Sequence, residues 1–130
     1  MNLLLDTHTF IWSRAAPDRL ARGARAGIAD PDNKVLVSLV TAWELAIKLG
    51  LGKPMLLPPD VGSWFLGALQ REQLELLRIE LQHVAAVEHL PVHHRDPFDR
   101  LLIAQARSEG LTIVTRDRQF EPYDVPVIWT

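Results

Sequence analysis

Four acidic residues at widely separated positions are the best candidates for chemistry in this sequence: Asp6, Glu44, Asp99 and Asp117. Carboxylates gathered in one place raise each other's pKa values unless a cation neutralises them, so a cluster of four would imply a bound ion. Because the donors are all oxygen, Mg²⁺ or Mn²⁺ is the expected cation. Such ions lower the pKa of a bound water and stabilise charge on a leaving oxygen. The chemistry indicated is therefore phosphodiester hydrolysis.

Short apolar runs alternate with amphipathic segments, and these are the elements that would position the acids. Strands are expected over residues 3–5, 35–38, 74–79, 111–114 and 125–129. Helices are expected over 9–14, 20–28, 41–49, from 58 to about 68, near 81–85 and over 96–109. Parallel strands need crossover helices between them. We therefore predict an α/β fold with one domain over residues 1–130, a parallel sheet of four to five strands, and helices on both faces.

The topology of such a sheet would bring the four acids to one edge. Asp6 directly follows the first strand, and Asp117 lies just past the fourth. Glu44 is expected in the first turn of the helix that follows the second strand. Asp99 is expected in the first turn of the helix that precedes the fourth strand. In open α/β sheets the strands end and the helices begin at the same edge, where ligands usually bind. We therefore expect these carboxylates to form a single metal site.

Each acid also has a structural interpretation that must be weighed. Glu44 follows a threonine at the spacing of a capping box, and Asp99 stands where a helix dipole favours an anion. Asp117 would suit the cap of a short turn, and Asp96, directly before a proline, is expected to cap its helix rather than to bind metal. Asp6 is harder to explain structurally, because a carboxylate ending a buried strand would lose its hydration without a partner.

The composition is that of an ordinary globular protein, with 48% hydrophobic and 23% charged residues in 130. The absence of cysteine excludes disulfides and thiolate metal sites. No apolar run approaches the roughly 20 residues of a membrane span, and no basic leader is visible, so we expect a cytoplasmic protein. The net charge of −2 argues against a generic nucleic-acid binder. If four of the sixteen acidic residues bind metal, however, the net charge of the remaining charged residues is +2, and this objection weakens.

Four segments of the sequence resemble the motifs of PIN-domain nucleases, and more narrowly those of VapC-like toxins of bacterial toxin–antitoxin modules. They are LLDTH at 4–8, SLVTAWELAIK at 38–48, HRDPFDRLLIAQA at 94–106 and LTIVTRD at 111–117. The segments occur in the family's order, and the resemblance covers nearly the whole chain. The fourth motif often has asparagine where this chain has Arg116.

The resemblance implies a PIN-like fold and a Mg²⁺-dependent endoribonuclease toxin, silenced by a cognate antitoxin that inserts a segment near the site. It implies that Asp6 and Asp99 are the principal metal ligands, and that Glu44 and Asp117 complete the site directly or through water. A homodimer and toxin–antitoxin hetero-oligomers are implied as well. Two alternatives stay open, namely an RNA-processing PIN nuclease without an antitoxin and a catalytically silent PIN-fold binding module.

Several neighbouring residues carry lesser expectations. The rings of Trp43, Trp64 and Phe65, at helical spacing, are expected in the core, and the paired His93 and His94 in a solvated loop. A phosphatase with a nucleophilic aspartate is disfavoured, because that class needs a second aspartate two residues after Asp6. Basic residues near the acidic motifs have two interpretations, an ordinary solvated surface and contact with RNA phosphates. Phosphate contact is favoured more for Lys48 and Arg100 than for the other four, which are Arg14, Arg95, Arg116 and Arg118.

Overall fold

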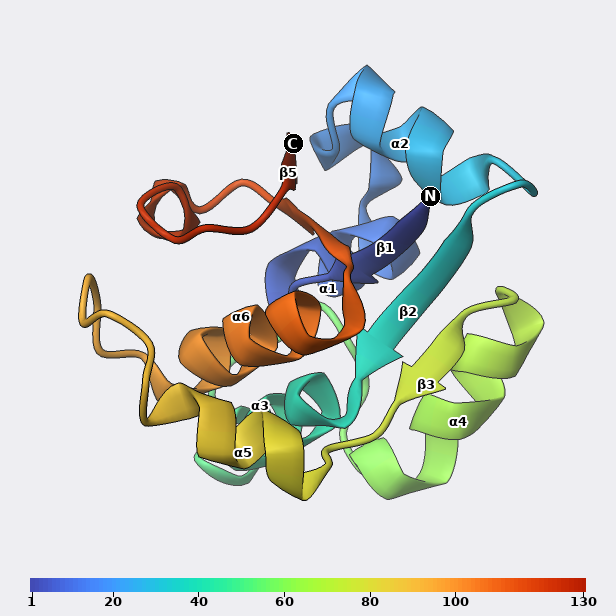
Figure 1. Cartoon of the computed structure of the whole chain (residues 1–130). Coiled ribbons are helices and arrows are strands. Elements are labelled where there is room, and N and C mark those ends of the chain that lie inside the picture. Colours follow the sequence, from blue (N-terminus) through green and yellow to red (C-terminus); the bar gives the residue numbers. More distant parts are fainter.

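Five strands form one parallel sheet in the order β3-β2-β1-β4-β5 in the computed structural model, which describes all 130 residues (Figure 1). The register aligns Leu5 of β1 with Val37 of β2 and Val114 of β4, so these three strands end side by side. The predicted parallel α/β sheet is confirmed. The strands are β1 (Asn2–Leu5), β2 (Lys34–Ser38), β3 (Glu75–Leu77), β4 (Thr112–Thr115) and β5 (Val127–Trp129).

Six α-helices and two short 3-10 helices connect and cover the strands. None of the helices is long and apolar enough to cross a membrane. The α-helices are α1 (Thr7–Ala15), α2 (Arg22–Ala29), α3 (Leu39–Gly50), α4 (Val61–Arg71), α5 (Leu81–Val87) and α6 (Pro97–Glu109), and the 3-10 helices are η1 (Pro17–Arg19) and η2 (Arg118–Phe120).

The core consists of two apolar clusters, one on each face of the sheet, because successive strand residues point to opposite faces. Leu4 of β1 packs with residues of α5 and α6 on one face. Its neighbours Leu3 and Leu5 pack with residues of α1, α2 and α4 on the other. Helix α3 contributes Val40 to the first cluster and Leu45 to the second. The predicted helices on both faces are confirmed, and α3 joins the two layers.

Two helices begin earlier than the sequence predicted, and each difference changes the surroundings of an acid. Helix α1 begins directly after Asp6, whose carboxylate caps it by accepting the backbone N–H of Thr9 at 2.9 Å. Helix α3 begins directly after Ser38, whose hydroxyl accepts the N–H of Val40. Glu44 therefore lies in the second turn of α3, and the predicted capping box that includes it is wrong.

Helix α6 begins and ends as its sequence predicted. The Asp96 carboxylate accepts the backbone N–H groups of Phe98 and Asp99 at 2.8 and 3.1 Å, and Pro97 occupies the first helical position. Gly110 ends the helix in the left-handed region with φ 67°, a conformation that glycine adopts without steric cost. The well-defined start of α6 fixes the place of Asp99.

Candidate functional site

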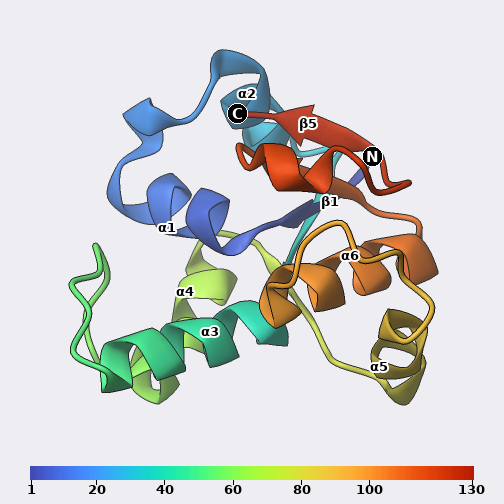
Figure 2. The same cartoon turned by 90° about the vertical axis from the view of Figure 1, so that its left-hand side faces the viewer.

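The four predicted acids all lie at the edge of the sheet where β1, β2 and β4 end. Figure 2 shows the beginnings of α1, α3 and α6 gathered around the end of β1. The negative charges of Asp6, Glu44 and Asp117 act on the carboxyl group of Asp99 from this edge. Residues that are up to 111 positions apart in the sequence are thereby brought together.

Asp99 is the acid whose charge is least well accommodated. Its side chain accepts no hydrogen bond from the protein, and it is partly buried in the first turn of α6. Desolvation by burial, followed by the charges of Asp96, Asp6, Glu44 and Asp117, raises the pKa of Asp99 from 3.8 to about 8. A cation beside this carboxylate would stabilise its ionised form and so lower this pKa.

Asp6 is almost fully buried, and burial raises the pKa of its carboxyl group. Hydrogen bonds from the hydroxyl group of Thr115 and from Thr9 act in the opposite direction. The same Thr115 oxygen accepts the backbone N–H of Asp117 at 3.0 Å, so one hydroxyl links two of the acids. Asp6 therefore has the structural partners that the sequence did not reveal.

Glu44 is also buried, with 4% of its surface exposed, but protein groups hold both of its oxygens. Its Oε1 accepts a hydrogen bond from the hydroxyl of Thr7 at 2.7 Å, and its Oε2 pairs with Lys48 at 2.6 Å. The Thr7 hydroxyl lies 3.2 Å from that of Thr41, a contact that sequence reasoning missed because Thr41 was taken as a helix cap. Lys48 thus neutralises Glu44, and any contact of Lys48 with phosphate would compete with this ion pair.

Asp117 borders a hollow of about 280 Å³ that opens beside Asp6. Its carboxylate caps the short helix η2 by accepting the backbone N–H of Gln119 at 2.9 Å, as its sequence position allowed. The hollow is lined by Asp6, His8, Trp12, Arg116 and Asp117.

The side chains at this edge fit a hard divalent cation in their chemistry. All of the candidate donors are carboxylate oxygens, and Asp99 has no protein partner that satisfies it. As they stand, however, no three histidine, aspartate or glutamate side chains are arranged to hold a metal ion. Threonine hydroxyls and Lys48 engage Asp6 and Glu44 instead. Metal binding would therefore require these carboxylates to reorient.

The guanidinium of Arg100, one of the two residues most favoured for phosphate contact, is occupied within the protein. It donates to the carbonyl of Pro91 at 2.8 Å and to the hydroxyl of Tyr123 at 3.0 Å. The backbone N–H groups of His93 and His94 donate to the same hydroxyl. His93 is exposed as expected and His94 is partly buried, and the rings of both pack against that of Tyr123. These contacts hold the loop between α5 and α6 in place.

The three aromatic residues expected in the core differ in their exposure. Phe65 is buried and Trp64 is partly buried, but Trp43 on α3 is 50% exposed. The Trp43 ring lies 4.9 Å from that of Phe98, centroid to centroid, so it joins the starts of α3 and α6 from outside the core. The core prediction is therefore wrong for Trp43. An exposed apolar row along α3 comprises Leu39, Trp43, Ile47 and Leu51.

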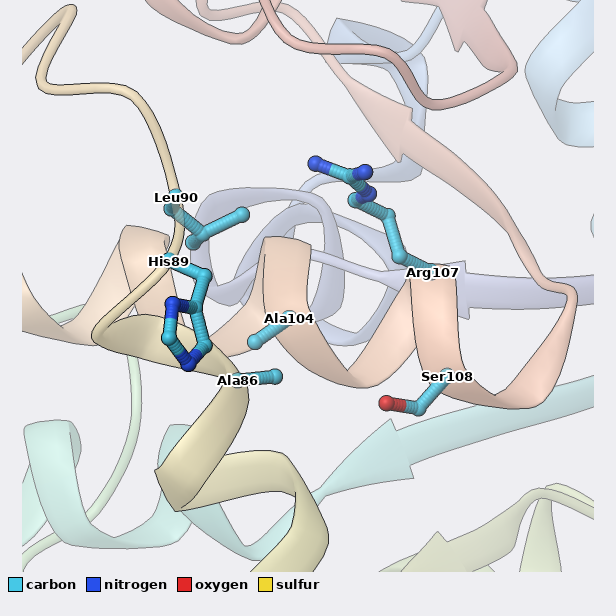
Figure 3. Close-up of a pocket in the computed structure, with 6 residues that line it drawn as sticks. All are labelled: Ala86, His89, Leu90, Ala104, Arg107 and Ser108. Atoms are coloured by element: carbon cyan, nitrogen blue, oxygen red, sulfur yellow. The ribbon is translucent and has the colours of Figure 1, made fainter.

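A second hollow, of about 190 Å³, lies between α5 and α6 and includes none of the four acids (Figure 3). The apolar part of its lining comes from Ala86, Leu90 and Ala104. Figure 3 shows the side chains of Arg107 and Ser108 leaving α6 in different directions. Because its polar groups do not converge on one point, this hollow offers no counterpart to the acidic edge.

Comparison with known proteins identifies the family. A family model described as PIN domain matches residues 3–126. The chain belongs to the PIN-domain family. This PIN domain is 32% identical over 127 residues to "Ribonuclease VapC22" of Mycobacterium tuberculosis, a match that covers 95% of this chain and 93% of that protein. Its place among the VapC proteins agrees with the resemblance of its four motifs.

Solved structures share the fold of this PIN domain. VapBC2 from Rickettsia felis, bound to a promoter DNA fragment, matches with a TM-score of 0.72 at 15% identity, covering 98% of each chain. DNA-bound VapBC from Salmonella typhimurium matches with a TM-score of 0.65 at 21% identity, covering 98% of this chain and 97% of that one. At these identities the matches establish a common fold.

Proposed function

We propose that this PIN domain is an endoribonuclease that requires Mg²⁺, or Mn²⁺ in its place, and hydrolyses RNA phosphodiesters. The observation that carries the proposal is the carboxyl group of Asp99, whose pKa is raised to about 8 by burial and by the charges of other acids at the same edge. Strongly perturbed acids clustered in this way are typical of functional sites. The 32% identity to a ribonuclease of the VapC group supports RNA as the substrate.

Asp6 and Asp99 are the principal metal ligands in this proposal, and Glu44 and Asp117 complete the site directly or through water. When bound, the ion supplies an activated water and stabilises charge on the leaving oxygen. The hydroxyls of Thr7 and Thr115 donate to Glu44 and Asp6 before the ion binds, and Lys48 balances the charge of Glu44.

The test compares two neighbouring acids of one helix terminus. Asp99→Asn is expected to abolish Mg²⁺-dependent cleavage of RNA by the purified protein. Asp96→Asn is the matched control, because asparagine caps helices as well as aspartate does, and cleavage should stay within about tenfold of the wild-type rate. Equal cleavage by both variants, or cleavage that persists in EDTA, rejects the proposed mechanism.

We further propose that this nuclease is the cytoplasmic toxin of a toxin–antitoxin module. A cognate antitoxin would insert a segment near the acids, and the toxin would form homodimers and toxin–antitoxin hetero-oligomers. The VapBC assemblies named among its structural relatives support such a partner. So does the exposed apolar row on α3, since contiguous exposed apolar surface commonly marks a protein interface.

Growth experiments separate a toxin from its alternatives. Expression of the wild-type chain is expected to arrest bacterial growth, and co-expression of a small DNA-binding protein encoded immediately upstream should restore it. Cleavage of RNA without growth arrest, and with no such upstream gene, indicates an RNA-processing nuclease instead. Mg²⁺ binding with no turnover on any RNA indicates a silent binding module.

A further inference from the structure

Three of the six basic residues near the acidic motifs are engaged by ion pairs or hydrogen bonds within the chain. Arg14 pairs with Glu72 at 3.2 Å, Lys48 pairs with Glu44, and Arg100 donates to the loop before α6. Arg95, Arg116 and Arg118 have no carboxylate partner. Of these three, Arg116 lines the hollow that Asp6 and Asp117 also border.

Two contacts hold the guanidinium of exposed Arg116 in a defined orientation. Its central carbon lies 4.1 Å from the centroid of the Trp12 ring, so that the cation stands over the face of the indole. One of its terminal nitrogens donates to the backbone carbonyl of Arg19. A guanidinium has five N–H donors in a rigid plane, so donors remain free after these contacts. Arg116 is therefore an oriented cation with unused donors at the acidic edge.

We propose that Arg116, supported by Trp12, binds a backbone phosphate of the RNA strand beside the carboxylate site. This inference rests on the proposed function, because it takes RNA as the ligand. A phosphate approaching Asp6 and Asp117 meets like charge, and a guanidinium at the wall of the same hollow offsets that repulsion. Its planar donors match two oxygens of one phosphate. Because the side chain is already oriented, little conformational freedom is lost on binding.

The geometry favours a phosphate over a nucleobase as the group bound here. Stacking of a base on Trp12 would need an open face of that ring, but Arg116 covers one face and the ring also packs against the core cluster beneath α1. Phosphate contacts carry no sequence information, whereas base contacts do. The effect of removing Arg116 is therefore expected to be independent of RNA sequence.

Arg118 provides a closely matched control. It lies two residues further along the chain, is exposed, and has its guanidinium carbon 4.1 Å from the centroid of the Trp129 ring. Arg118 does not line the hollow beside Asp6, so the structure gives no support to the phosphate contact considered for it from its sequence position. Arg116→Ala and Arg118→Ala thus remove the same charge and the same kind of stacking contact, at positions that differ in their access to the acidic edge.

The experiment measures binding of fluorescently labelled oligouridylate and oligoadenylate by fluorescence anisotropy, in a buffer that contains Ca²⁺ as the divalent ion. Gel electrophoresis verifies that the probes stay intact. Arg116→Ala should weaken binding of both probes about tenfold, the loss of one charge-assisted contact. The slope of log K against log salt should become shallower by about 0.7. Arg116→Lys should keep the slope while losing part of the affinity, because it keeps the charge but not the planar donors. Arg118→Ala should match the wild type.

Equal losses in Arg116→Ala and Arg118→Ala would overturn the inference, because they would show a general effect of charge. A loss confined to one probe would also overturn it, since it would indicate that Arg116 reads a base. Cleavage of RNA by the wild type, combined with unaltered binding by Arg116→Ala, rejects the phosphate site and leaves the proposed function intact. A wild-type protein that neither binds nor cleaves RNA rejects both.

Discussion

The starts of α3 and α6 each bring one acid to the same edge of the sheet, and the two acids are treated differently by their surroundings. Glu44 of α3 is buried, yet a threonine hydroxyl and the ammonium group of Lys48 hold its two oxygens. Asp99 of α6 is less buried, but no protein group donates to its side chain, and desolvation by burial together with the charges of neighbouring acids raises its pKa to about 8. The protein balances one charge and leaves the other unbalanced.

This difference separates two roles within one proposed metal site. An acid already neutralised by its own protein can orient other groups, and it gains little from an added cation. An acid that is partly buried close to like charges gains much, because a cation offsets both the lost hydration and the repulsion that raise its pKa. Asp99 is therefore the position at which metal binding should matter most.

The largest expected effect is on cleavage. Asp99→Asn should lower the rate of Mg²⁺-dependent RNA cleavage about a thousandfold or more, roughly 4 kcal/mol of transition-state stabilisation. Glu44→Gln should lower it by about ten- to a hundredfold, because Lys48 already balances the charge that is removed. Single-turnover rates at saturating Mg²⁺ provide the comparison. Similar losses in the two variants would remove the distinction between the acids.

The next effect concerns the pH dependence of stability in EDTA. With a pKa of about 8 when folded and 3.8 as its ordinary value, Asp99 keeps its proton in the folded chain at pH values where the unfolded chain has lost it. The folded state then binds more protons between about pH 4 and 8, so stability should fall as the pH rises through this window.

Urea unfolding at several pH values measures this slope directly. Asp99→Asn should flatten the dependence by up to one proton, and Glu44→Gln should leave more of it in place. Asp6, whose pKa is also raised, should preserve part of the slope in either variant. A wild-type protein whose stability rises over the same window would show that Asp99 is ionised there.

The smallest expected effect concerns the ion pair within α3. Lys48→Met should destabilise the fold by about 1–3 kcal/mol, because it leaves the buried Glu44 carboxylate without its cation. The same substitution in a Glu44→Gln background should cost clearly less, and the difference is the coupling between the two groups. Urea denaturation of all four proteins gives this value. Additive effects would indicate that the pair contributes nothing.

The sheet could be predicted from sequence because its strands are short apolar runs that end at polar residues. Gly110 and Pro97 marked the ends of α6, since their backbone preferences suit those positions. The start of α4 was less regular, because Asp60 adopts the left-handed region with φ 64° and its side chain makes no cap. The start of α3 was missed because β2 passes into the helix at Ser38 without an intervening loop.

The shared edge of the acids was predictable from topology, but their individual surroundings were not. Capping was assigned to Glu44, which makes no cap, whereas Asp6, thought to lack a structural role, caps α1. Spacing along the sequence shows which residues could cap a helix. Contacts with distant parts of the chain decide whether a given residue does so. Trp43 was misassigned for a related reason. Apolar residues at helical spacing give the same sequence pattern whether the helix face that carries them is buried or exposed.

The central claim is that the carboxylates at this edge bind a divalent ion that Asp99 needs. Calorimetric titration of Mn²⁺ at pH 7, repeated in buffers of different ionisation enthalpy, tests it most directly. Wild-type protein should bind Mn²⁺ and release a proton as it does so, because Asp99 with a pKa of about 8 must ionise to bind a cation. Asp99→Asn should bind far more weakly, without that proton. Equally tight binding by both proteins, or no binding by the wild type, would contradict the account.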